Sequence, residues 1–189
     1  FVGATKDGTS NTHFGYIFGA SSSSNNSTYV PTSLKEVIII EGTSIESSAF
    51  SGCTGLTSIT IPSSVTSICG AAFSNCTGLT EVKLPEKLTT IYAYAFNGCT
   101  GLTSIKLPDS ITTMSATAFQ NCTNLSSVNF PKNWNTTYSY YNNNNSEGYH
   151  YTPFNGCSSL TTITIPEGVT EIPAYAFKGL ASLETVKFS

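Results

Sequence analysis

Hydrophobic residues recur along most of the chain with a spacing of 23 positions. Each copy is marked by a Phe, at positions 50, 73, 96 and 119, and after a gap of 35 residues the series resumes with Phe154 and Phe177. Leu follows every one of these Phe residues by six positions, and Cys follows the first five by three. Self-similarity at a period of this length is the signature of a repeat solenoid, in which each turn is stabilised by its neighbours.

Within each copy, the string Leu-x-x-Ile-x-Ile-Pro alternates apolar and polar positions, as a half-buried strand does. The Pro ends the strand because it cannot donate a hydrogen bond to a sheet. Two further apolar residues, such as Val65 and Ile68, predict a short second strand, and Ala-Phe-x-x-Cys predicts a single helical turn. The expected fold class is an α/β repeat solenoid that is strand-dominated, with a parallel sheet along one face.

Two segments depart from the repeat. Residues 1–33 carry no copy, but they include Phe14 and Phe18, so we predict an N-terminal cap there and repeats over 34–189. The wider gap before Phe154 adds twelve residues, which the register of the repeat places within 135–148. That stretch is polar and rich in Tyr and Asn, and we predict that it forms a projecting loop.

The inserted segment contains three closely spaced tyrosines, Tyr138, Tyr140 and Tyr141, which are candidate ligand contacts. Tyr gives a large contact area at low entropy cost, and the neighbouring Asn residues give adaptable hydrogen bonds, as in an antibody paratope. Stacking of the rings on sugars is an alternative. In a third interpretation the tyrosines fold back over Trp134 and seal a widened core.

The polar positions of the first strand form a second candidate surface. If the apolar positions point inward, Lys83 and Lys106 point outward at equivalent places in successive copies, and Ser104 and Asn129 lie in the same strip. This strip is either a ligand-binding surface or a solubilising one. We treat these four residues as candidate ligand contacts.

Composition and charge exclude several classes of function. Only 10% of the residues are charged, the net charge is -3 and the eight Lys and Arg are scattered, which argues against a nucleic-acid partner. The longest apolar run, Val37 to Ile40, is far shorter than the roughly 20 residues that span a bilayer. We therefore expect no membrane insertion by these residues.

No arrangement in the sequence predicts a catalytic, metal or cofactor site. Five of the six Cys share one repeat position, which predicts a buried ladder of free thiols, and only Cys69 lies elsewhere. Cys69 follows a core position, so it should lie near the surface. The only two His, His13 and His150, lie in the predicted cap and beside the predicted loop. We expect neither a catalytic dyad nor a zinc site.

The full string Ala-Phe-x-x-Cys-x-x-Leu-x-x-Ile-x-Ile-Pro-x-x-Val-x-x-Ile resembles the BspA-like leucine-rich repeats of bacterial surface proteins and some parasitic protists. The resemblance covers residues 34 to 188. It implies secretion or surface display, and adhesion to host or bacterial surface proteins or to glycans. Fold alone does not establish function, because solenoids serve many partners.

We therefore expect a non-catalytic binding or adhesion module of a secreted or cell-surface bacterial protein. The alternatives are a structural spacer and a carbohydrate-binding appendage of a larger surface enzyme. Because the chain begins without Met and stops within a copy of the pattern, we also expect further repeats or domains in the parent chain.

Overall fold

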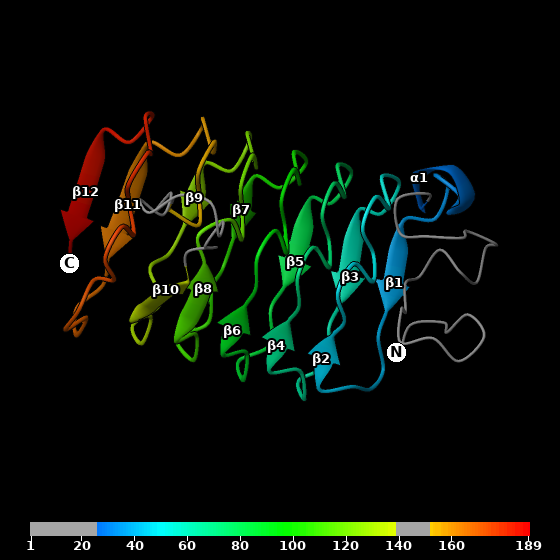
Figure 1. Ribbon diagram of the computed structural model, residues 1–189, viewed down its shortest axis with the longest axis horizontal. Coiled ribbons are helices and arrows are strands. Elements are labelled where there is room, and N and C mark those ends of the chain that lie inside the picture. Colours follow the sequence, from blue (N-terminus) through cyan, green and yellow to red (C-terminus); the bar gives the residue numbers. More distant parts are fainter. Residues whose placement is uncertain (1–25, 139–151) are drawn as a thin grey trace, which may run out of the picture.

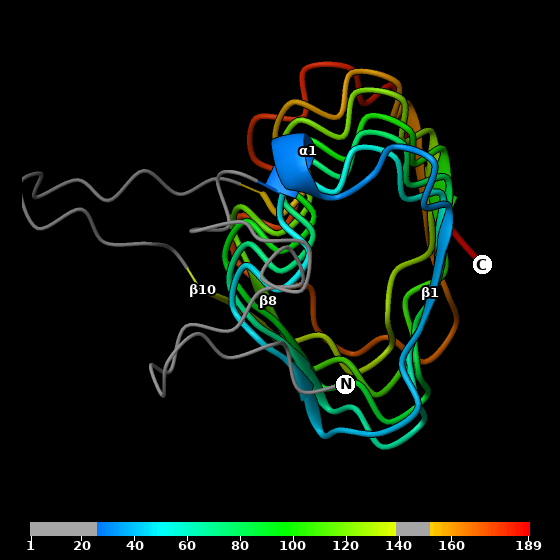
Figure 2. The ribbon, with the colours of Figure 1, turned by 90° about the vertical axis from the view of Figure 1, so that its right-hand side faces the viewer.

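A computed structural model describes residues 26–138 and 152–189 of the chain. These residues form an elongated parallel β-solenoid, whose turns follow one another along the long axis (Figure 1). Viewed along that axis, the turns superpose in a flattened ring (Figure 2). The strand-dominated solenoid predicted from the period of 23 residues is confirmed.

The first strand of each repeat lies on one long side of the solenoid. These strands are β1 (Glu36–Ile38), β3 (Ser58–Thr60), β5 (Glu81–Lys83), β7 (Ser104–Ile105), β9 (Ser127–Val128), β11 (Thr162–Ile165) and β12 (Thr185–Phe188). All of the pairs are parallel and join equivalent positions, as Ile59 joins Val82. Hydrogen bonding divides this side into three sheets, β1-β3-β5, β7-β9 and β11-β12.

The predicted second strands form one uninterrupted sheet on the opposite side. They are β2 (Ser44–Ile45), β4 (Ser67–Ile68), β6 (Thr90–Ile91), β8 (Thr113–Ser115) and β10 (Thr136–Tyr138). Strand β10 contains the first residues of the segment for which we expected a loop. It pairs with β8 because Thr136, Thr137 and Tyr138 are good strand formers and the preceding Trp134 is buried in the core.

The Ala-Phe-x-x-Cys segments consist of hydrogen-bonded turns instead of the expected helical turn. Their alternate N–H groups bond to the next repeat: the Phe50 N–H donates to the Ala72 carbonyl and the Gly52 N–H to the Ser74 carbonyl, both at 2.7 Å. A helix would need these donors for its own carbonyls. Positive φ angles, such as 58° at Ser48, further exclude a regular helix.

Among the described residues, the one helix is α1 (Asn26–Tyr29), which lies beside the first turn within the segment predicted to be a cap (Figure 2). The Asn26 side chain is fully buried, and its Nδ2 donates to the Ser51 carbonyl at 2.6 Å. This contact ties α1 to the turn after Phe50. Residues 1–25, which make up most of the predicted cap, lie outside the described residues.

The core is built from ladders of identical side chains. Five Phe rings, from Phe50 to Phe154, stack with centroid separations of 5.0 to 5.5 Å between neighbours. Leu residues such as Leu79 and Leu102 form a second buried ladder. Because each rung is covered by the next one, no single repeat could bury its own apolar face.

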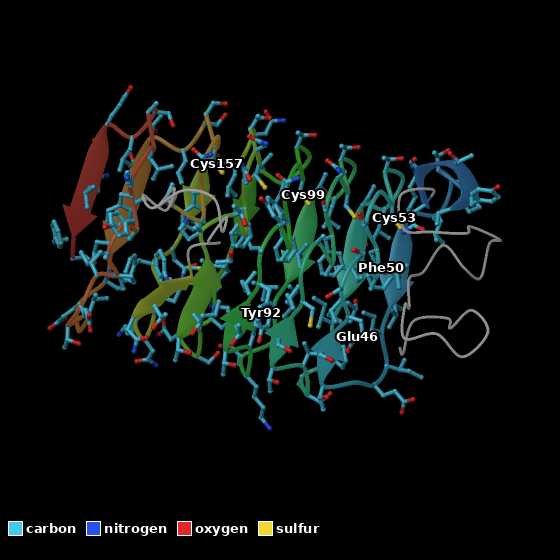
Figure 3. The ribbon with its side chains drawn as sticks, viewed as in Figure 1. Glu46, Phe50, Cys53, Tyr92, Cys99 and Cys157 are labelled. Atoms are coloured by element: carbon cyan, nitrogen blue, oxygen red, sulfur yellow. The ribbon has the colours of Figure 1, made fainter. Side chains whose placement is uncertain are left out.

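The thiol ladder predicted from the sequence is also confirmed. All five ladder cysteines are free and buried, and Cys53, Cys99 and Cys157 follow one line along the solenoid (Figure 3). From the second rung onward, each thiol donates to the Phe carbonyl of the preceding repeat, as Cys99 Sγ does to Phe73 at 3.1 Å. The other such donors are Cys76, Cys122 and Cys157, at 3.0, 3.0 and 3.2 Å.

Candidate functional site

The outward positions of the first strands place two lysines beside each other. Lys83 ends β5, and Lys106 directly follows β7 at the equivalent position of the next repeat. Both side chains are exposed, while the alternate residues Val82 and Ile105 are buried. The period-two alternation therefore places Lys83 and Lys106 on the surface, as predicted from the sequence.

The backbone ladder between these two strands is interrupted. At the other junctions on this side, except the one between β9 and β11, an N–H at the strand entry donates to the preceding repeat. Such bonds run from Thr57, Thr80 and Ser126 to the carbonyls of Lys35, Thr57 and Thr103, at 2.8, 3.0 and 3.0 Å. In the described structure no equivalent bond runs from Thr103 or Ser104 to the Thr80 carbonyl, and β5 and β7 belong to different sheets.

The interruption coincides with a groove of about 270 Å³. One wall comes from β5 and its flanks, with Thr80, Glu81, Lys83 and Glu86, and the other from β7 and its flanks, with Ser104, Lys106 and Pro108. Three of the predicted contact residues, Lys83, Ser104 and Lys106, therefore line the same groove. We refer to it as the β5–β7 groove.

The opening is confined to one side of the two repeats. On the opposite side β6 and β8 pair in register, Ile91 with Met114. In the core between the two sides, the rings of Phe73 and Phe96 remain stacked at 5.1 Å. The groove is thus a local feature of the first-strand face and does not reflect a break in the solenoid.

Asn129, the fourth predicted contact residue on this face, has a different role. Its Oδ1 accepts from the Leu107 N–H and its Nδ2 donates to the Leu107 carbonyl, both at 2.7 Å. The amide thereby replaces the backbone bonds that would continue the β7–β9 ladder. This contact fastens the end of β7 to the following repeat, on the side away from the groove.

The charged groups of the groove are not paired with each other. Within residues 26–138 and 152–189, neither Lys83 nor Lys106 forms an ion pair closer than 4 Å or a side-chain hydrogen bond. Glu81 precedes Lys83 by two residues on the same strand, and Glu86 follows it beyond the Pro. The groove therefore offers two free ammonium groups together with two carboxylates.

The predicted contact Tyr138 does not lie at this groove. Tyr138 belongs to β10, whose sheet is on the opposite side of the solenoid from β5 and β7. Tyr140 and Tyr141, with the rest of the predicted loop as far as residue 148, lie outside the described residues. Among the described residues, Tyr138 and the groove lysines are thus on opposite sides of the solenoid.

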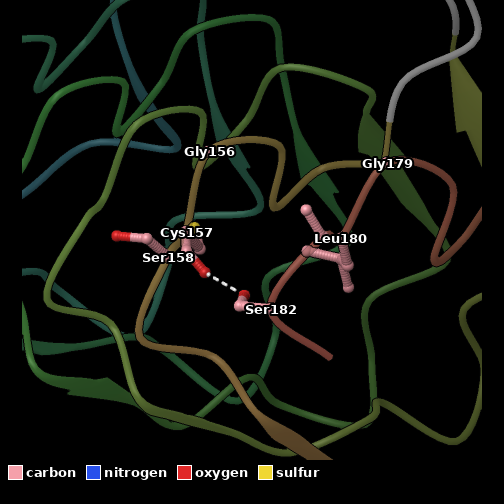
Figure 4. A pocket seen from close by; sticks show the side chains of 7 residues that line it. Gly156, Cys157, Ser158, Gly179, Leu180 and Ser182 are labelled. Atoms are coloured by element: carbon pink, nitrogen blue, oxygen red, sulfur yellow. Dashed lines mark hydrogen bonds between the residues drawn. The ribbon is translucent and has the colours of Figure 1, made fainter. Parts of the chain in front are cut away.

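A second hollow, of about 300 Å³, lies between the turns at Gly156–Ser158 and Gly179–Ser182 (Figure 4). Leu180 occupies the position that Cys holds in the five preceding repeats, and Ser182 Oγ donates to the Cys157 carbonyl at 3.1 Å. No charged side chain lines this hollow. We attribute it to the irregular packing of the last turn.

Cys53, Cys69 and Cys99 are poor nucleophiles at neutral pH. Burial raises the pKa of Cys53 and of Cys99 to about 12. Partial burial, and then the nearby Glu46 carboxylate, also raise the pKa of Cys69, although a hydrogen bond with Ser67 opposes the shift. Thiolate character is therefore suppressed even at the most accessible thiol.

The described part of the chain holds no cluster of three His, Cys, Asp or Glu that could bind a metal ion. His13 and His150 lie outside the described residues.

The sequence indicated the lysines but did not reveal the groove. Like charges that face each other directly on neighbouring strands are destabilising, and Lys83 and Lys106 are such a pair. The available signal was therefore the repetition of Lys at one repeat position. The repeat pattern offered no reason to select three other lining residues, Thr80, Glu81 and Glu86. They line a groove only because the ladder bonds between β5 and β7 are missing.

Comparison with known proteins supports the interpretation of the repeat. The family model described as BspA type Leucine rich repeat region matches residues 22–149 and 150–189, in six copies. No curated protein matches the sequence of this chain.

Solved structures of bacterial leucine-rich repeat proteins are similar to this chain. The leucine-rich repeat protein of T. pallidum is 23% identical, with a TM-score of 0.61, over 85% of this chain and 75% of its own. One from Bacteroides ovatus is 26% identical, with a TM-score of 0.54, over 82% and 45%. A leucine rich cell surface protein from Faecalibacterium prausnitzii is 28% identical, with a TM-score of 0.51, over 84% and 34%.

Proposed function

Because the chain belongs to the BspA-type leucine-rich repeat family, we propose that it is a non-catalytic binding or adhesion module of a secreted or cell-surface bacterial protein. Its partners are surface proteins of a host or of other bacteria, and glycans are a second class. The first-strand face is the contact surface in this proposal. The Tyr-rich segment around Tyr138, Tyr140 and Tyr141 is a further proposed contact region.

One observation carries the proposal, namely the β5–β7 groove. In it, the exposed residues Lys83, Ser104 and Lys106 lie beside backbone groups that lack the ladder bonds made at the β1–β3, β3–β5 and β7–β9 junctions. Polar groups without internal partners on a rigid, flat face are suited to recognising another molecule. A purely structural spacer has no need for such an interruption.

Two observations support the non-catalytic and extracellular parts of the proposal. Burial raises the pKa values of the Cys69 and Cys99 thiols, which disfavours nucleophilic chemistry at these residues. One similar structure is that of a cell surface protein. A separate finding is that no helix in the described part of the chain is long and apolar enough to cross a bilayer.

The test is binding of the purified chain to a panel of host-matrix proteins and glycans, measured by biolayer interferometry. The double variant Lys83→Ala/Lys106→Ala is compared with Lys187→Ala, which removes the lysine at the same repeat position on β12, outside the groove. We expect at least one panel member to bind, with an affinity that falls about tenfold in the double variant only.

A third variant addresses the Tyr-rich segment, with Tyr138, Tyr140 and Tyr141 all changed to Ala. Loss of binding in this variant alone would assign the contact surface to that segment. Binding that survives both sets of substitutions would reject both proposed contact surfaces. No binding to any panel member would favour the structural spacer and reject the proposed function.

A further inference from the structure

We propose that the β5–β7 groove binds an extended protein segment that carries a carboxylate side chain, with the carboxylate between Lys83 and Lys106. This inference rests on the proposed function, because it names the chemistry of the partner at the same face. It is carried by the placement of the two lysines on opposite walls of the groove, by the missing ladder bonds and by the size of the groove.

The two lysines define an anion position. They occupy equivalent positions on adjacent repeats and line the two walls of the same groove. Neither ammonium group has an ion-pair partner among the described residues. A carboxylate has two oxygens, and one such group can accept from both ammonium groups while it removes their mutual repulsion.

The backbone around the lysines favours a peptide over a free anion. The Thr80 carbonyl does not receive the bond that the Thr57 and Thr103 carbonyls receive from the following repeat. Ser104 lines the groove opposite Thr80 and provides a hydroxyl and an N–H at the other wall. Donors and acceptors at the spacing of a strand are the groups that bind the main chain of an extended segment.

The size of the groove indicates a side chain and its flanking backbone as the ligand. Pockets that enclose a whole small molecule measure roughly 300 to 1,000 Å³, and this groove is about 270 Å³. A small ligand would remain largely exposed here. A protein segment can instead place one side chain in the groove and make additional contacts along the flat strand face.

The acidic residues of the groove restrict the partner further. Glu81 lies two residues before Lys83, roughly 6.6 Å along the strand, and Glu86 lines the same groove. These carboxylates repel a second negative charge beside the bound one. The geometry therefore favours a segment with a single carboxylate between neutral or basic residues, and it disfavours polyanions such as nucleic acid.

The experiment is an NMR titration of the full chain, labelled with ¹⁵N, with the pentapeptide Ac-Thr-Val-Glu-Val-Thr-NH₂. Its Gln analogue, sodium acetate and inorganic phosphate are titrated in parallel. We expect amide shifts concentrated in residues 80–86 and 103–108, and an affinity about fivefold higher for the Glu peptide than for the Gln peptide. Lys83→Ala/Lys106→Ala should abolish this preference, and Lys187→Ala should preserve it.

Equal binding of the Glu and Gln peptides would overturn the carboxylate assignment and leave the first-strand face as a protein-binding surface. Acetate or phosphate shifts as large as those of the Glu peptide would reduce the groove to a simple anion site and overturn the peptide assignment. Absence of shifts in these two segments would overturn the whole inference. None of these results changes whether the chain binds the panel of host-matrix proteins and glycans, so the proposed function is tested separately.

Discussion

The side-chain amide of Asn129 pairs with both backbone polar groups of Leu107, at 2.7 Å each. The substitution Asn129→Ala would remove both partners at once. Loss of hydrogen bonds to backbone groups that are shielded from water costs about 1–3 kcal/mol. We expect the free energy of unfolding, measured by urea denaturation, to fall by about this amount.

Thr164→Ala is the matched control for Asn129→Ala, since Thr164 holds the same repeat position on β11 and its exposed side chain makes no hydrogen bond within the described structure. Its free energy of unfolding should change by less than about 0.5 kcal/mol. If the two variants are equally stable, the amide does not fasten β7 to the following repeat.

Gly101 allows two repeats to approach closely. A Cβ at this position would lie 2.6 Å from the Thr77 carbonyl oxygen and 2.9 Å from that of Leu79, and both are backbone atoms of the preceding repeat. Such atoms cannot move aside without shifting the whole turn. We expect Gly101→Ala to lower the free energy of unfolding by about 1–3 kcal/mol, measured by urea denaturation.

The comparison for Gly101→Ala is Gly70→Ala, because a Cβ at Gly70 meets its nearest neighbour at an ordinary 3.5 Å. This variant should differ from the wild type by less than about 0.5 kcal/mol. Similar losses in both variants would show that the effect comes from removing Gly and not from the close approach of the repeats.

The thiol ladder makes the fold sensitive to alkaline pH. Burial raises the pKa of Cys99 from 9.0 to about 12, so this thiol stays neutral in the folded chain while it ionises in the unfolded chain. Its contribution to stability is complete below about pH 9 and is lost as the pH rises toward 12. Over this window the slope is on the order of 1.4 kcal/mol per pH unit for each such thiol.

Cys99→Ala isolates this contribution from the tyrosines and lysines that titrate in the same range. We would measure its free energy of unfolding by urea denaturation at a series of pH values from about 8 to about 11. This free energy should decline less steeply with pH than that of the wild type. Parallel curves for the two proteins would contradict the assignment of the pH dependence to the buried thiol.

Only one thiol should react in the folded protein. Cys69 is half-buried, whereas the five ladder thiols are buried and four of them donate to Phe carbonyls. An aromatic disulfide reagent at neutral pH should label one equivalent of thiol, and Cys69→Ser should remove that labelling. Labelling of ladder thiols without denaturant would show that the turns open.

The nearby Glu46 carboxylate should slow the reaction of Cys69, because it contributes to the raised pKa of this thiol. Glu46→Gln removes the negative charge, which lowers that pKa and increases the thiolate fraction. We expect faster labelling at neutral pH than in the wild type. An unchanged rate would indicate that burial alone controls the reactivity of Cys69.

Most of the fold could be predicted from the sequence, because the core residues of a solenoid recur at the period of the repeat. Finding that period therefore also identifies the core. Phe96 and Cys99 are buried for the same reason as their counterparts 23 residues away. The form of the turn at Phe96 could not be predicted as readily. Short helical turns and hydrogen-bonded turns share the same apolar pattern, and the choice depends on N–H groups that bond to the neighbouring repeat.

The candidate site was predictable only in part. Alternation placed Lys83, Ser104 and Lys106 on one face, but nothing in the pattern distinguished this junction from the one between Thr60 and Lys83. The role of Asn129 was also hidden, since its amide replaces backbone bonds of Leu107 that a regular strand would have made. Such replacements depend on the geometry of two neighbouring strands, so the repeat pattern of the sequence does not reveal them.

The ladder bonds of this solenoid run parallel to its long axis, from each turn to the next. A pulling force on the two ends would therefore act along these bonds, and the turns would separate one junction at a time. The β5–β7 and β9–β11 junctions have no strand pairing on one side. We expect the molecule to hinge at these two junctions under tension, so that mechanical load would widen the groove to which a partner binds.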